Sequence, residues 1–324
     1  MKFAILESND PYLNLAIEEY LFRYTTSDVF LLWQNEPSVV VGVNQNIFAE
    51  VDLEYLKIKN IHPVRRITGG GAVYHDLGNV NYSYITKAKS SDEIDFKSYT
   101  KPVIDALRAL SVDATLSGRN DLYVDGMKFS GNAQHRECDR VLHHGTILFN
   151  ADFNELSNIL TVDEDKLKSK AVKSVRSRVV NLSTYLKDFS VDSFIKHISE
   201  YIIKEFSPEV IKIDITPEID WLRKRNMSDD WIYPKRDFVS KYTLCRKKRY
   251  TFGSVELNIS LRNTIITDIS IFGDFFGNSA VNELAHIMKD TDIEKISDTL
   301  SCVDVSKYIS GMSTSDFVEL IRRG

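Results

Sequence analysis

The sequence predicts an α/β protein made of one large domain and one small domain. Helical apolar stripes and short strand-like runs follow one another through residues 1–245, and the pattern then changes to a hairpin followed by helices. A chain of 324 residues is long enough to bury about three quarters of its unfolded surface, which suits this division. We therefore expect a main domain over residues 1–245 and a small α+β domain over residues 246–324.

The composition is that of a globular protein and argues against several classes. Apolar residues make up 43% of the chain and charged residues 27%, and the formal net charge of -5 argues against a general nucleic-acid binder. No apolar run approaches the roughly 18 residues that a membrane span needs, and the first residues lack the apolar core of a signal peptide. Three cysteines without CxxC spacing indicate neither a disulfide framework nor a zinc site. A cytoplasmic protein that binds neither nucleic acid nor membrane is expected.

The first quarter of the chain predicts helices and short strands. Asp10 and Pro11 begin a helix whose apolar residues recur every three or four positions as far as Tyr24. Two buried strands, a helix and a half-buried strand are then expected at residues 29–33, 38–42, 48–58 and 80–85.

Two arginines and three glycines stand together in the segment Arg65-Arg66-Ile67-Thr68-Gly69-Gly70-Gly71. Glycine weakens strands, so this run indicates a backbone with unusual dihedral angles or one that lies close to a ligand. Backbone N–H groups in such a turn can converge on phosphate oxygens, and a guanidinium adds a charged, planar donor. The alternative is a glycine-rich hairpin with a solvated arginine pair, and the run by itself leaves both interpretations open.

The middle of the chain predicts a long helix from Phe96 and then a tight hairpin at Asp125-Gly126. A type I′ turn needs positive φ at both central positions, which Asp-Gly tolerates well. Lys128 alternates with its apolar neighbours in this ladder, so its side chain should leave the opposite face. A lone lysine on a strand is usually solvated, and its position alone assigns it no function.

Two adjacent histidines, His143 and His144, open another strand-like run. Their side chains point to opposite faces, so we expect one imidazole in the core and one exposed, rather than a shared metal. Residues 166–178 are rich in lysine and arginine, which is typical of a solvated loop but also of a segment that covers a polyphosphate or meets an acidic partner. A helix is predicted over residues 191–206.

The last part of the chain begins with a domain boundary expected near residues 240–248. A hairpin follows around Arg262-Asn263, with alternating apolar residues on its first strand. Helical patterns at residues 280–288 and 316–321 complete the predicted small domain.

Four segments, in this order and spacing, resemble the lipoate-protein ligase family: RRITGGGAVYHDLGN, GRNDLYVDGMKFSGNAQ, HHGTILF and KSKAVKSVRSRVVNL. The resemblance covers most of the chain, because the tail containing IFGDFFG resembles the accessory carboxy-terminal domain of that family. Four ordered motifs make coincidence improbable, whereas GGG or HHG alone would prove little.

The resemblance implies a fold, an activity and a set of partners. The fold would be the central mixed sheet flanked by helices that biotin ligases and class II aminoacyl-tRNA synthetases share, with a small α+β carboxy-terminal domain. The activity would use ATP and Mg²⁺ to convert lipoate to lipoyl-AMP with release of pyrophosphate, and would then transfer the lipoyl group to a lysine of a lipoyl domain. Such domains belong to the E2 subunits of 2-oxoacid dehydrogenases and to the H protein of glycine cleavage.

The resemblance also implies roles for individual residues. ATP and the adenylate would be bound by Arg66 and by the segment of Gly70, Gly71, Ala72, Val73 and Tyr74. Lys128 would be the catalytic residue and would bridge the lipoyl carbonyl and the phosphate. Asn120 and Asp121 would lie near the phosphates, with Asp121 as a metal ligand, and His75 and His144 would line the lipoyl pocket.

One segment departs from the family. Members usually carry a Trp-Asn-Phe-Gly-like run before the accessory domain, where this chain has Trp231-Ile232-Tyr233-Pro234-Lys235-Arg236. The departure bears on the linker, the interdomain contact and the choice of acceptor, and it leaves the chemistry motifs untouched.

Two alternatives to the ligase are kept. An ATP-independent transferase of the same fold would carry octanoyl or lipoyl groups as a cysteine thioester, and Cys138 is its candidate nucleophile. The charges of Arg136 and Arg140 would favour the thiolate while those of Glu137 and Asp139 oppose it, so no strong activation is expected. Neither Cys245 nor Cys302 lies among the four motifs. The third interpretation is a non-catalytic protein that binds lipoate or the adenylate.

Overall fold

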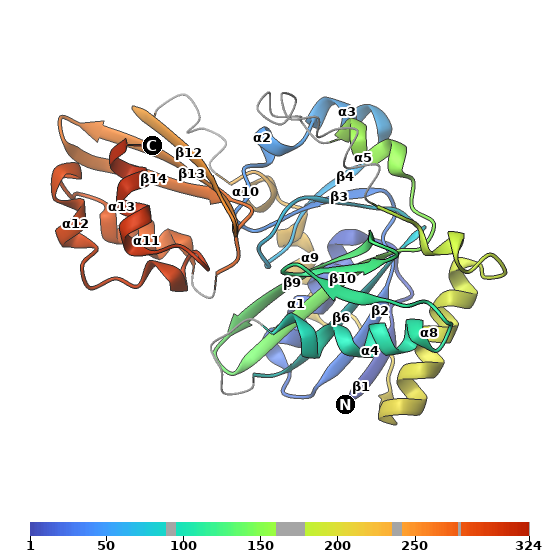
Figure 1. The fold of residues 1–324 in the computed structure, drawn as a ribbon. Helices are drawn as coiled ribbons and strands as arrows, with labels where there is room; N and C mark the ends of the chain where they lie inside the picture. The colour runs from blue at the N-terminus through green and yellow to red at the C-terminus, as the bar shows by residue number, and fades with distance from the viewer. Residues whose placement is uncertain (89–94, 160–178, 235–241, 278–279, 324) are drawn as a thin grey trace. The chain divides into compact units, whose positions relative to one another are not determined.

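The computed structural model describes residues 1–88, 95–159, 179–234, 242–277 and 280–323. The chain divides into two compact units (Figure 1). The first comprises Met1–Val40, Glu50–Val64 and Val73–Ser228, and the second comprises Val41–Ala49, Arg65–Ala72 and Asp229–Gly324. Two short pieces from the first quarter of the chain therefore belong to the same unit as the carboxy-terminal part. The cationic run at residues 166–178 lies outside the described residues.

The first unit is built on an eight-stranded sheet in the order β11-β1-β2-β6-β10-β9-β8-β7. Its strands are β1 (Lys2–Ile5), β2 (Val29–Trp33), β6 (Asn79–Lys87), β7 (Thr115–Ser117), β8 (Asp121–Val124), β9 (Met127–Glu137), β10 (Arg140–Leu148) and β11 (Glu209–Val210). Strand β1 runs parallel to β2 and β11, and the other neighbours pair antiparallel. The predicted mixed sheet is thus present.

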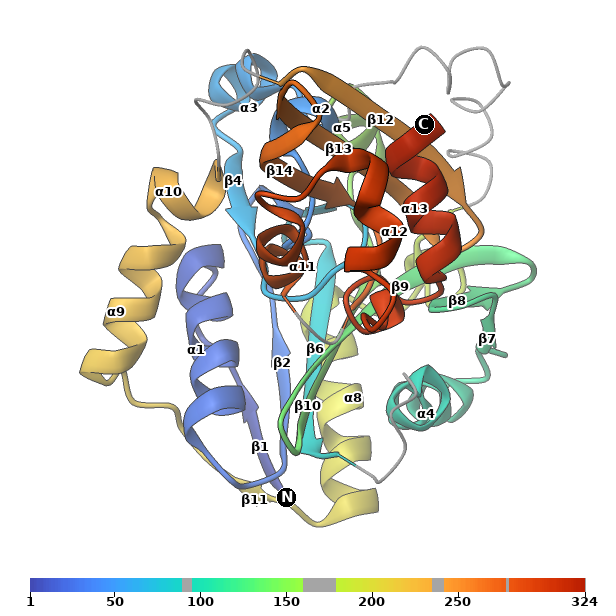
Figure 2. The ribbon, with the colours of Figure 1, turned by 90° about the vertical axis from the view of Figure 1, so that its left-hand side faces the viewer.

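Helices cover both faces of this sheet (Figure 2). Helices α1 (Pro11–Tyr24) and α9 (Pro217–Asn226) lie on one face, and α4 (Phe96–Arg108) and α8 (Val191–Phe206) lie on the other. Asp10 caps α1 by accepting hydrogen bonds from the N–H groups of Tyr12 and Leu13, which explains why the helix begins where the sequence predicted. An ion pair of 2.5 Å between Arg225 and the buried Glu19 joins α9 to α1.

The two faces of the sheet differ in chemistry. On the α4/α8 face the side chains form the apolar core, which includes Phe30, Tyr82, Phe129, Val103, Leu107, Phe194 and Ile198. On the α1 face, polar residues of β6 and β10 replace part of that apolar surface, among them the buried Asn81, Ser83 and His144. Because side chains alternate along a strand, the same strands supply a structural face and a polar face.

A smaller sheet has the order β4-β3-β5, with β3 (Ser38–Val41), β4 (His62–Arg65) and β5 (Val73–His75). The helix predicted at residues 48–58 is wrong as a single element, because the structure has α2 (Ile47–Glu50) and α3 (Leu53–Lys59). Asp52 separates them: its side chain accepts the N–H of Tyr55 at 2.9 Å and starts a new helix. Helix α5 (Phe153–Ile159) and the short helix η1 (Leu182–Thr184) follow later.

The second unit has a three-stranded antiparallel sheet of β12 (Leu244–Tyr250), β13 (Gly253–Arg262) and β14 (Ile265–Gly273). With it are α10 (Asp229–Ile232), α11 (Val281–Met288), η3 (Ile293–Lys295), α12 (Ile296–Thr299), η4 (Val305–Lys307) and α13 (Thr314–Arg323). The predicted hairpin is confirmed, since Asn263 turns the chain with a φ of 55°. Across the described ranges of both units, no helix combines the length and apolarity that crossing a bilayer requires.

Candidate functional site

The hairpin of β8 and β9 carries Lys128. Its turn has φ values of 50° at Asp125 and 74° at Gly126, which confirms the predicted type I′ turn. Tyr123 pairs with Lys128 and Leu122 pairs with Ser130, so β9 holds one residue more than β8 at this point. Such a β-bulge changes the direction of the side chains around it.

The bulge brings Lys128 and Asp121 together on one face. Asp121 pairs with Gly131 across the two strands, and the Lys128 ammonium Nζ lies 2.8 Å from Asp121 Oδ1. A Cβ atom on Gly131 would lie 3.3 Å from that Nζ, so the glycine leaves the space that the ammonium occupies. The side chains of Lys128 and Asp121 are 35% and 25% exposed, and the pair therefore remains accessible to a ligand.

Asn120 is held in place by Asn132. The Asn120 amide donates to the carbonyl of Asn132 at 2.5 Å, and the Asn132 amide donates back to the carbonyl of Asn120 at 2.9 Å. The Asn132 oxygen accepts a hydrogen bond from the hydroxyl of the fully buried Tyr82. A Cβ on Gly145 would collide with both of those side chains, so the glycine that follows the two histidines permits this packing. Asn120 thereby fixes the backbone that presents Asp121.

His144 and Glu18 meet on the α1 face of the sheet. The Glu18 carboxylate accepts from His144 Nδ1 at 2.9 Å and from the Ser83 hydroxyl at 2.6 Å, and Ser83 in turn accepts from Trp33 Nε1 at 2.8 Å. Both His144 and Glu18 are buried, with exposures of 9% and 1%. A buried carboxylate is tolerated here because each of its partners is a polar hydrogen donor.

The expectation of one core and one exposed imidazole is wrong, because His143 is also fully buried. On the α4/α8 face, its ring stacks on Tyr99 with 5.5 Å between centroids, and Gln134 contacts its Nδ1 at 2.9 Å. Burial lowers the pKa of His143 well below its usual value, so the ring is neutral. The alternation of the strand was predicted correctly, but both faces of this strand are covered.

His75 joins the group around Trp33. Its Nδ1 lies 3.1 Å from the Asn35 amide nitrogen, and its ring meets Trp33 edge-on with 6.1 Å between centroids. Since Trp33 also bonds Ser83, the structure brings His75 and His144 to one side of the sheet through Trp33, Ser83 and Glu18. The neighbouring Tyr74 is buried, which raises the pKa of its hydroxyl and keeps it protonated.

Within the second unit, Arg66 shapes the glycine run. Its guanidinium donates to the carbonyls of Gly69 at 2.7 Å and Gly71 at 2.8 Å, and to the Thr68 hydroxyl at 2.9 Å. Arg65 and Arg66 are 2% and 6% exposed, so the alternative of a solvated arginine pair is wrong.

The three glycines have different surroundings. Gly70 has a φ of 95°, which favours glycine, while a Cβ on Gly69 would collide with the carbonyl of Phe275. Gly71 is exposed, and no atom of the described residues lies within 4 Å of the place that a Cβ on it would take. Gly70 therefore has the unusual dihedral angle predicted from the sequence, and Gly69 has the predicted close approach. Gly71 faces open space. Ala72 and Val73 continue the segment, and both are at intermediate exposure.

Arg65 binds main-chain carbonyls. Its donors reach five oxygens, those of Gly42, Val43, Gln45, Trp231 and Ile232. Burial lowers the pKa of Arg65 to about 10, which still leaves it charged at neutral pH. The atypical segment that begins at Trp231 is thus anchored at its first two residues, Trp231 and Ile232. Its last two residues, Lys235 and Arg236, lie outside the described ranges.

The cysteines and the acidic residues bear on the alternatives. Cys138 is exposed at the turn between β9 and β10, ten residues along the hairpin from Lys128, which corresponds to about 30 Å. Cys245 and Cys302 are exposed as well. In the part of the chain that the structure describes, no group of three or more His, Cys, Asp or Glu side chains could hold a metal ion.

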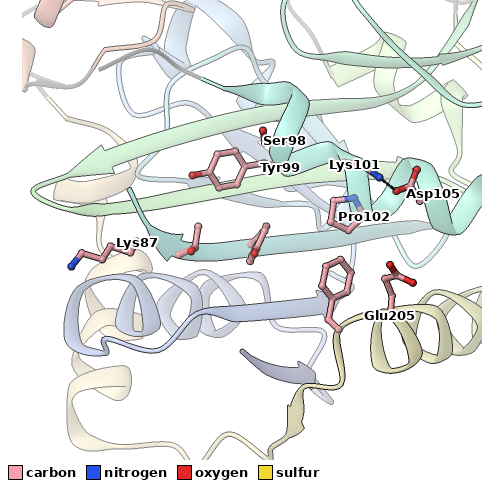
Figure 3. Close-up of a pocket in the computed structure, with 10 residues that line it drawn as sticks. Lys87, Ser98, Tyr99, Lys101, Pro102, Asp105 and Glu205 are labelled. Carbon is pink, nitrogen blue, oxygen red and sulfur yellow. Dashed lines mark hydrogen bonds and ion pairs between the residues drawn. The ribbon is translucent and has the colours of Figure 1, made fainter. Parts of the chain in front are cut away.

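A cavity of about 250 Å³ lies elsewhere in the first unit, between the end of β6, α4 and the end of α8 (Figure 3). Tyr99 and Pro102 of α4, Lys87 of β6 and Glu205 of α8 line it, and an ion pair joins Lys101 to Asp105 at its edge. The described lining contains none of the predicted site residues.

Comparison with known families decides what kind of protein this is. The model of the lipoyl protein ligase A/B catalytic domain matches residues 10–203, and that of the bacterial lipoate protein ligase C-terminus matches residues 240–321. The chain belongs to the lipoate-protein ligase family. The resemblance carried by the four motifs is confirmed, and so is the expectation of an enzyme of the ligase class.

Individual relatives agree with this assignment. The lipoate-protein ligase LplJ of Bacillus subtilis is 39% identical over 324 residues, which cover 97% of each chain. The crystal structure of P. falciparum LipL1 in complex with lipoate has a TM-score of 0.79 and 27% identity, and the match covers 99% of this chain and 98% of the other.

Two further solved structures match the greater part of this ligase. A lipoate-protein ligase A bound with ATP has a TM-score of 0.60 at 27% identity, covering 72% of this chain and 98% of that one. A bi-partite lipoate protein ligase from Thermoplasma acidophilum, studied with its E2 lipoyl domain, has a TM-score of 0.63 at 28% identity, covering 75% and 98%. The predicted fold class is therefore confirmed.

Several residues of this ligase that surround the predicted site were not singled out from the sequence. Glu18, Trp33 and Ser83 are the main ones. The available signal was weak: Glu18 precedes the buried Leu21 and Phe22 by three and four positions, the spacing of one helix face. A polar residue in such a position is informative only once its partner on the sheet is known.

Proposed function

We propose that this ligase activates lipoate with ATP to form lipoyl-AMP, releases pyrophosphate, and then transfers the lipoyl group to a specific lysine of a lipoyl-domain protein. The observation that carries the proposal is the Lys128 ammonium, held 2.8 Å from Asp121 on the same face of the sheet as His144. A fixed, accessible cation on the polar face of the sheet is what the attack of a carboxylate on a phosphate requires.

Lys128 acts electrostatically in the first half-reaction. The lipoate carboxylate and the α-phosphate are both anions, and negative charge builds up on the phosphate oxygens and the leaving group. An ammonium between them offsets this repulsion, and pairing with Asp121 holds it in place before the substrates bind. Lys128 is thus the catalytic residue and contacts both the lipoyl carbonyl and the phosphate.

Asp121, with Asn120 behind it, suits a site for Mg²⁺ bound together with ATP. Magnesium is often held by one or two carboxylates plus substrate phosphates, so a larger cluster of acidic residues is not needed. The Asp121 carboxylate is partly exposed and its backbone is fixed by the Asn120–Asn132 clamp, which fits this role. The ion would neutralise phosphate charge during activation.

ATP and the adenylate are assigned to Arg66 and to the segment from Gly70 to Tyr74. Open space around Gly71 permits a phosphate to approach the backbone, and Arg66 holds the loop carbonyls inward. The lipoyl chain is assigned to the surroundings of His75 and His144, where the buried indole of Trp33 is an apolar neighbour. Glu18 orients His144 there.

The second half-reaction delivers the lipoyl group to a protein. The acceptor lysine has a reference pKa of about 10.4, so about 0.1% of it is neutral at pH 7.4 and the complex must favour its deprotonation. Acceptors would be the lipoyl domains of 2-oxoacid dehydrogenase E2 subunits or the H protein of glycine cleavage, in the cytoplasm. The T. acidophilum ligase studied with an E2 lipoyl domain supports this class of partner. We assign the chemistry to residues 1–245 and an accessory role to residues 246–324.

Lipoate-dependent exchange of labelled pyrophosphate into ATP tests the proposal. The protein should catalyse this exchange without any acceptor, and should then modify a lipoyl domain but not a variant whose acceptor lysine is changed to arginine. An ATP-independent transferase or a simple lipoate binder would show no exchange. The transferase is also disfavoured by geometry, because Cys138 lies about 30 Å along the hairpin from Lys128.

A further inference from the structure

Two buried asparagines on β6 form an incomplete pair. The Asn79 amide nitrogen donates to Asn81 Oδ1 at 2.9 Å, and the two residues are 0% and 1% exposed. Among the residues that the structure describes, Asn81 Nδ2 and Asn79 Oδ1 have no hydrogen-bond partner. In this arrangement the pair has one free donor, on Asn81, and one free acceptor, on Asn79. Buried polar groups are almost always satisfied, so a free donor at this depth calls for a partner from outside the protein.

The register of the sheet locates Asn81 within the α1 face. Asn81 pairs with Trp33 on β2 and with Thr146 on β10, and directly opposed residues share one face about 5 Å apart. On one side, Trp33 leads to His75, whose ring it meets edge-on. On the other side, the Thr146 hydroxyl accepts the N–H of Gly131, the glycine that makes room for the Lys128 ammonium.

Asn81 therefore lies between the residues assigned to the acyl chain and the residue assigned to the reacting carboxyl group. The one part of lipoate that must touch both regions is its carboxyl group. A neutral N–H donor suits this group through the whole reaction, because it can bond a carboxylate oxygen before activation and the acyl carbonyl oxygen afterwards. Lys128 supplies the positive charge, and Asn81 would fix the orientation of the carboxyl group.

We propose that the side-chain amide of Asn81 donates a hydrogen bond to an oxygen of the carboxyl group of the acyl substrate. This inference rests on the proposed function of the same site, since it takes lipoate as the ligand. Asn79 acts as the positioning residue, because its own amide holds Asn81 Oδ1 and turns the Asn81 nitrogen away from the pair. The recognised group is the carboxyl, so the contact is independent of the dithiolane ring.

The test uses Asn81→Asp, which keeps the size of the side chain and the oxygen that Asn79 binds but removes the donor. In pyrophosphate exchange, the KM for lipoate should rise about ten-fold or more, as expected for the loss of a hydrogen bond to a charged group. Octanoate carries the same carboxyl group and should lose affinity by the same factor, whereas the KM for ATP should stay within about two-fold. A second variant, Asn81→Ala, also removes the donor, guards against a folding defect of the buried aspartate and should show the same pattern.

A binding measurement separates this inference from the activity. Lipoate alone should raise the melting temperature of the wild-type protein and should raise that of either variant much less. Asn226→Asp is the matched control: Asn226 is 1% exposed, its amide donates to the Tyr12 carbonyl at 3.1 Å, and it lies in α9 away from the polar pair. This control should lower the melting temperature without ligand and leave the shift caused by lipoate unchanged.

The outcomes are distinct. The inference would be overturned if both Asn81 variants kept the lipoate-induced shift in melting temperature and the wild-type KM values for lipoate and octanoate. A rise in the KM for ATP alone would also overturn it. So would a rise in the KM for lipoate with the KM for octanoate unchanged. If the wild-type protein shows a lipoate-induced shift but no pyrophosphate exchange, the proposed activity fails while the loss of that shift in Asn81→Asp still supports the carboxyl contact.

Discussion

Glu18 and His144 are 126 residues apart in the chain, and the Glu18 carboxylate lies 2.9 Å from His144 Nδ1. Glu18→Gln removes the charge of this contact while keeping the side-chain size, so His144 should lose its fixed orientation. We expect the kcat/KM for lipoate to fall about ten-fold, with the KM for ATP nearly unchanged. The neighbouring Glu19→Gln is the control. Glu19 binds Arg225 instead, and its loss should lower the melting temperature but not the use of lipoate.

Lys128→Ala should strongly slow activation while leaving the fold intact. The loss of one cation at the developing anion is expected to slow pyrophosphate exchange by about 10² to 10³-fold, by analogy with deleted oxyanion donors. Circular dichroism and the melting temperature should match those of the wild type, because the side chain is 35% exposed. Lys87→Ala, at an exposed lysine on β6 with 75% exposure, should keep full activity. Exchange at the wild-type rate in Lys128→Ala would refute the catalytic assignment.

The glycine run should respond differently at its first and third positions. Gly71→Val adds a side chain into open space, so it should fold normally while raising the KM for ATP, because the Cβ branch would meet the phosphate. Gly69→Ala should instead lower the melting temperature, since its Cβ would collide with the Phe275 carbonyl. Comparing thermal melts with the KM for ATP in the two variants checks this. Similar losses of stability in both would support a purely structural role for the run.

His143 should make the protein sensitive to acid. Its pKa is lowered by burial in the folded state from an unfolded value of 6.5, so the unfolded chain binds the proton more readily. The stability contribution is therefore complete above about pH 6.5 and is lost as the pH falls below it. The denaturant midpoint should decrease between about pH 6.5 and 5, and His143→Gln should reduce this slope. A variant with the same slope as the wild type would show that other groups dominate the titration.

Changing all three cysteines to serine should preserve ATP-dependent lipoylation of an acceptor domain. Cys138 is remote from Lys128 along β9, and neither Cys245 nor Cys302 lies among the four motifs, so none is expected to carry the acyl group. Mass spectrometry should find no hydroxylamine-sensitive acyl adduct on the wild-type protein during turnover. Loss of activity in Cys138→Ser together with a trapped thioester would establish the transferase instead.

Much of the fold could be predicted because local signals and tertiary structure agree. The Asp10 cap, the Asp125-Gly126 turn and the amphipathic helix over residues 191–206 are each encoded within a few residues, and the structure has each of them. The prediction of a single helix at residues 48–58 was wrong, because Asp52 caps a new helix in the middle of the apolar periodicity. Apolar spacing alone does not show where one helix ends and another begins.

The candidate site was predicted only in part, because some of its members are defined by long-range contacts. The motifs carry Lys128, His75 and His144, but the partner of His144 is on a helix more than a hundred residues away. The expectation of one exposed histidine failed for the same reason: periodicity assigns a face to each side chain and does not say that α1 and α4 cover both faces.

Arg65 holds the segment that begins at Trp231 through its backbone. All five oxygens that its guanidinium binds belong to the main chain, and those of Trp231 and Ile232 are available whatever side chains stand at these positions. The Arg65 guanidinium therefore recognises the path of the backbone, and the Trp231 indole adds one side-chain contact by donating to the Arg65 carbonyl at 2.9 Å. Substitutions at Ile232 can therefore change the side chain in the segment that departs from the family's usual run without removing the carbonyl that Arg65 binds there.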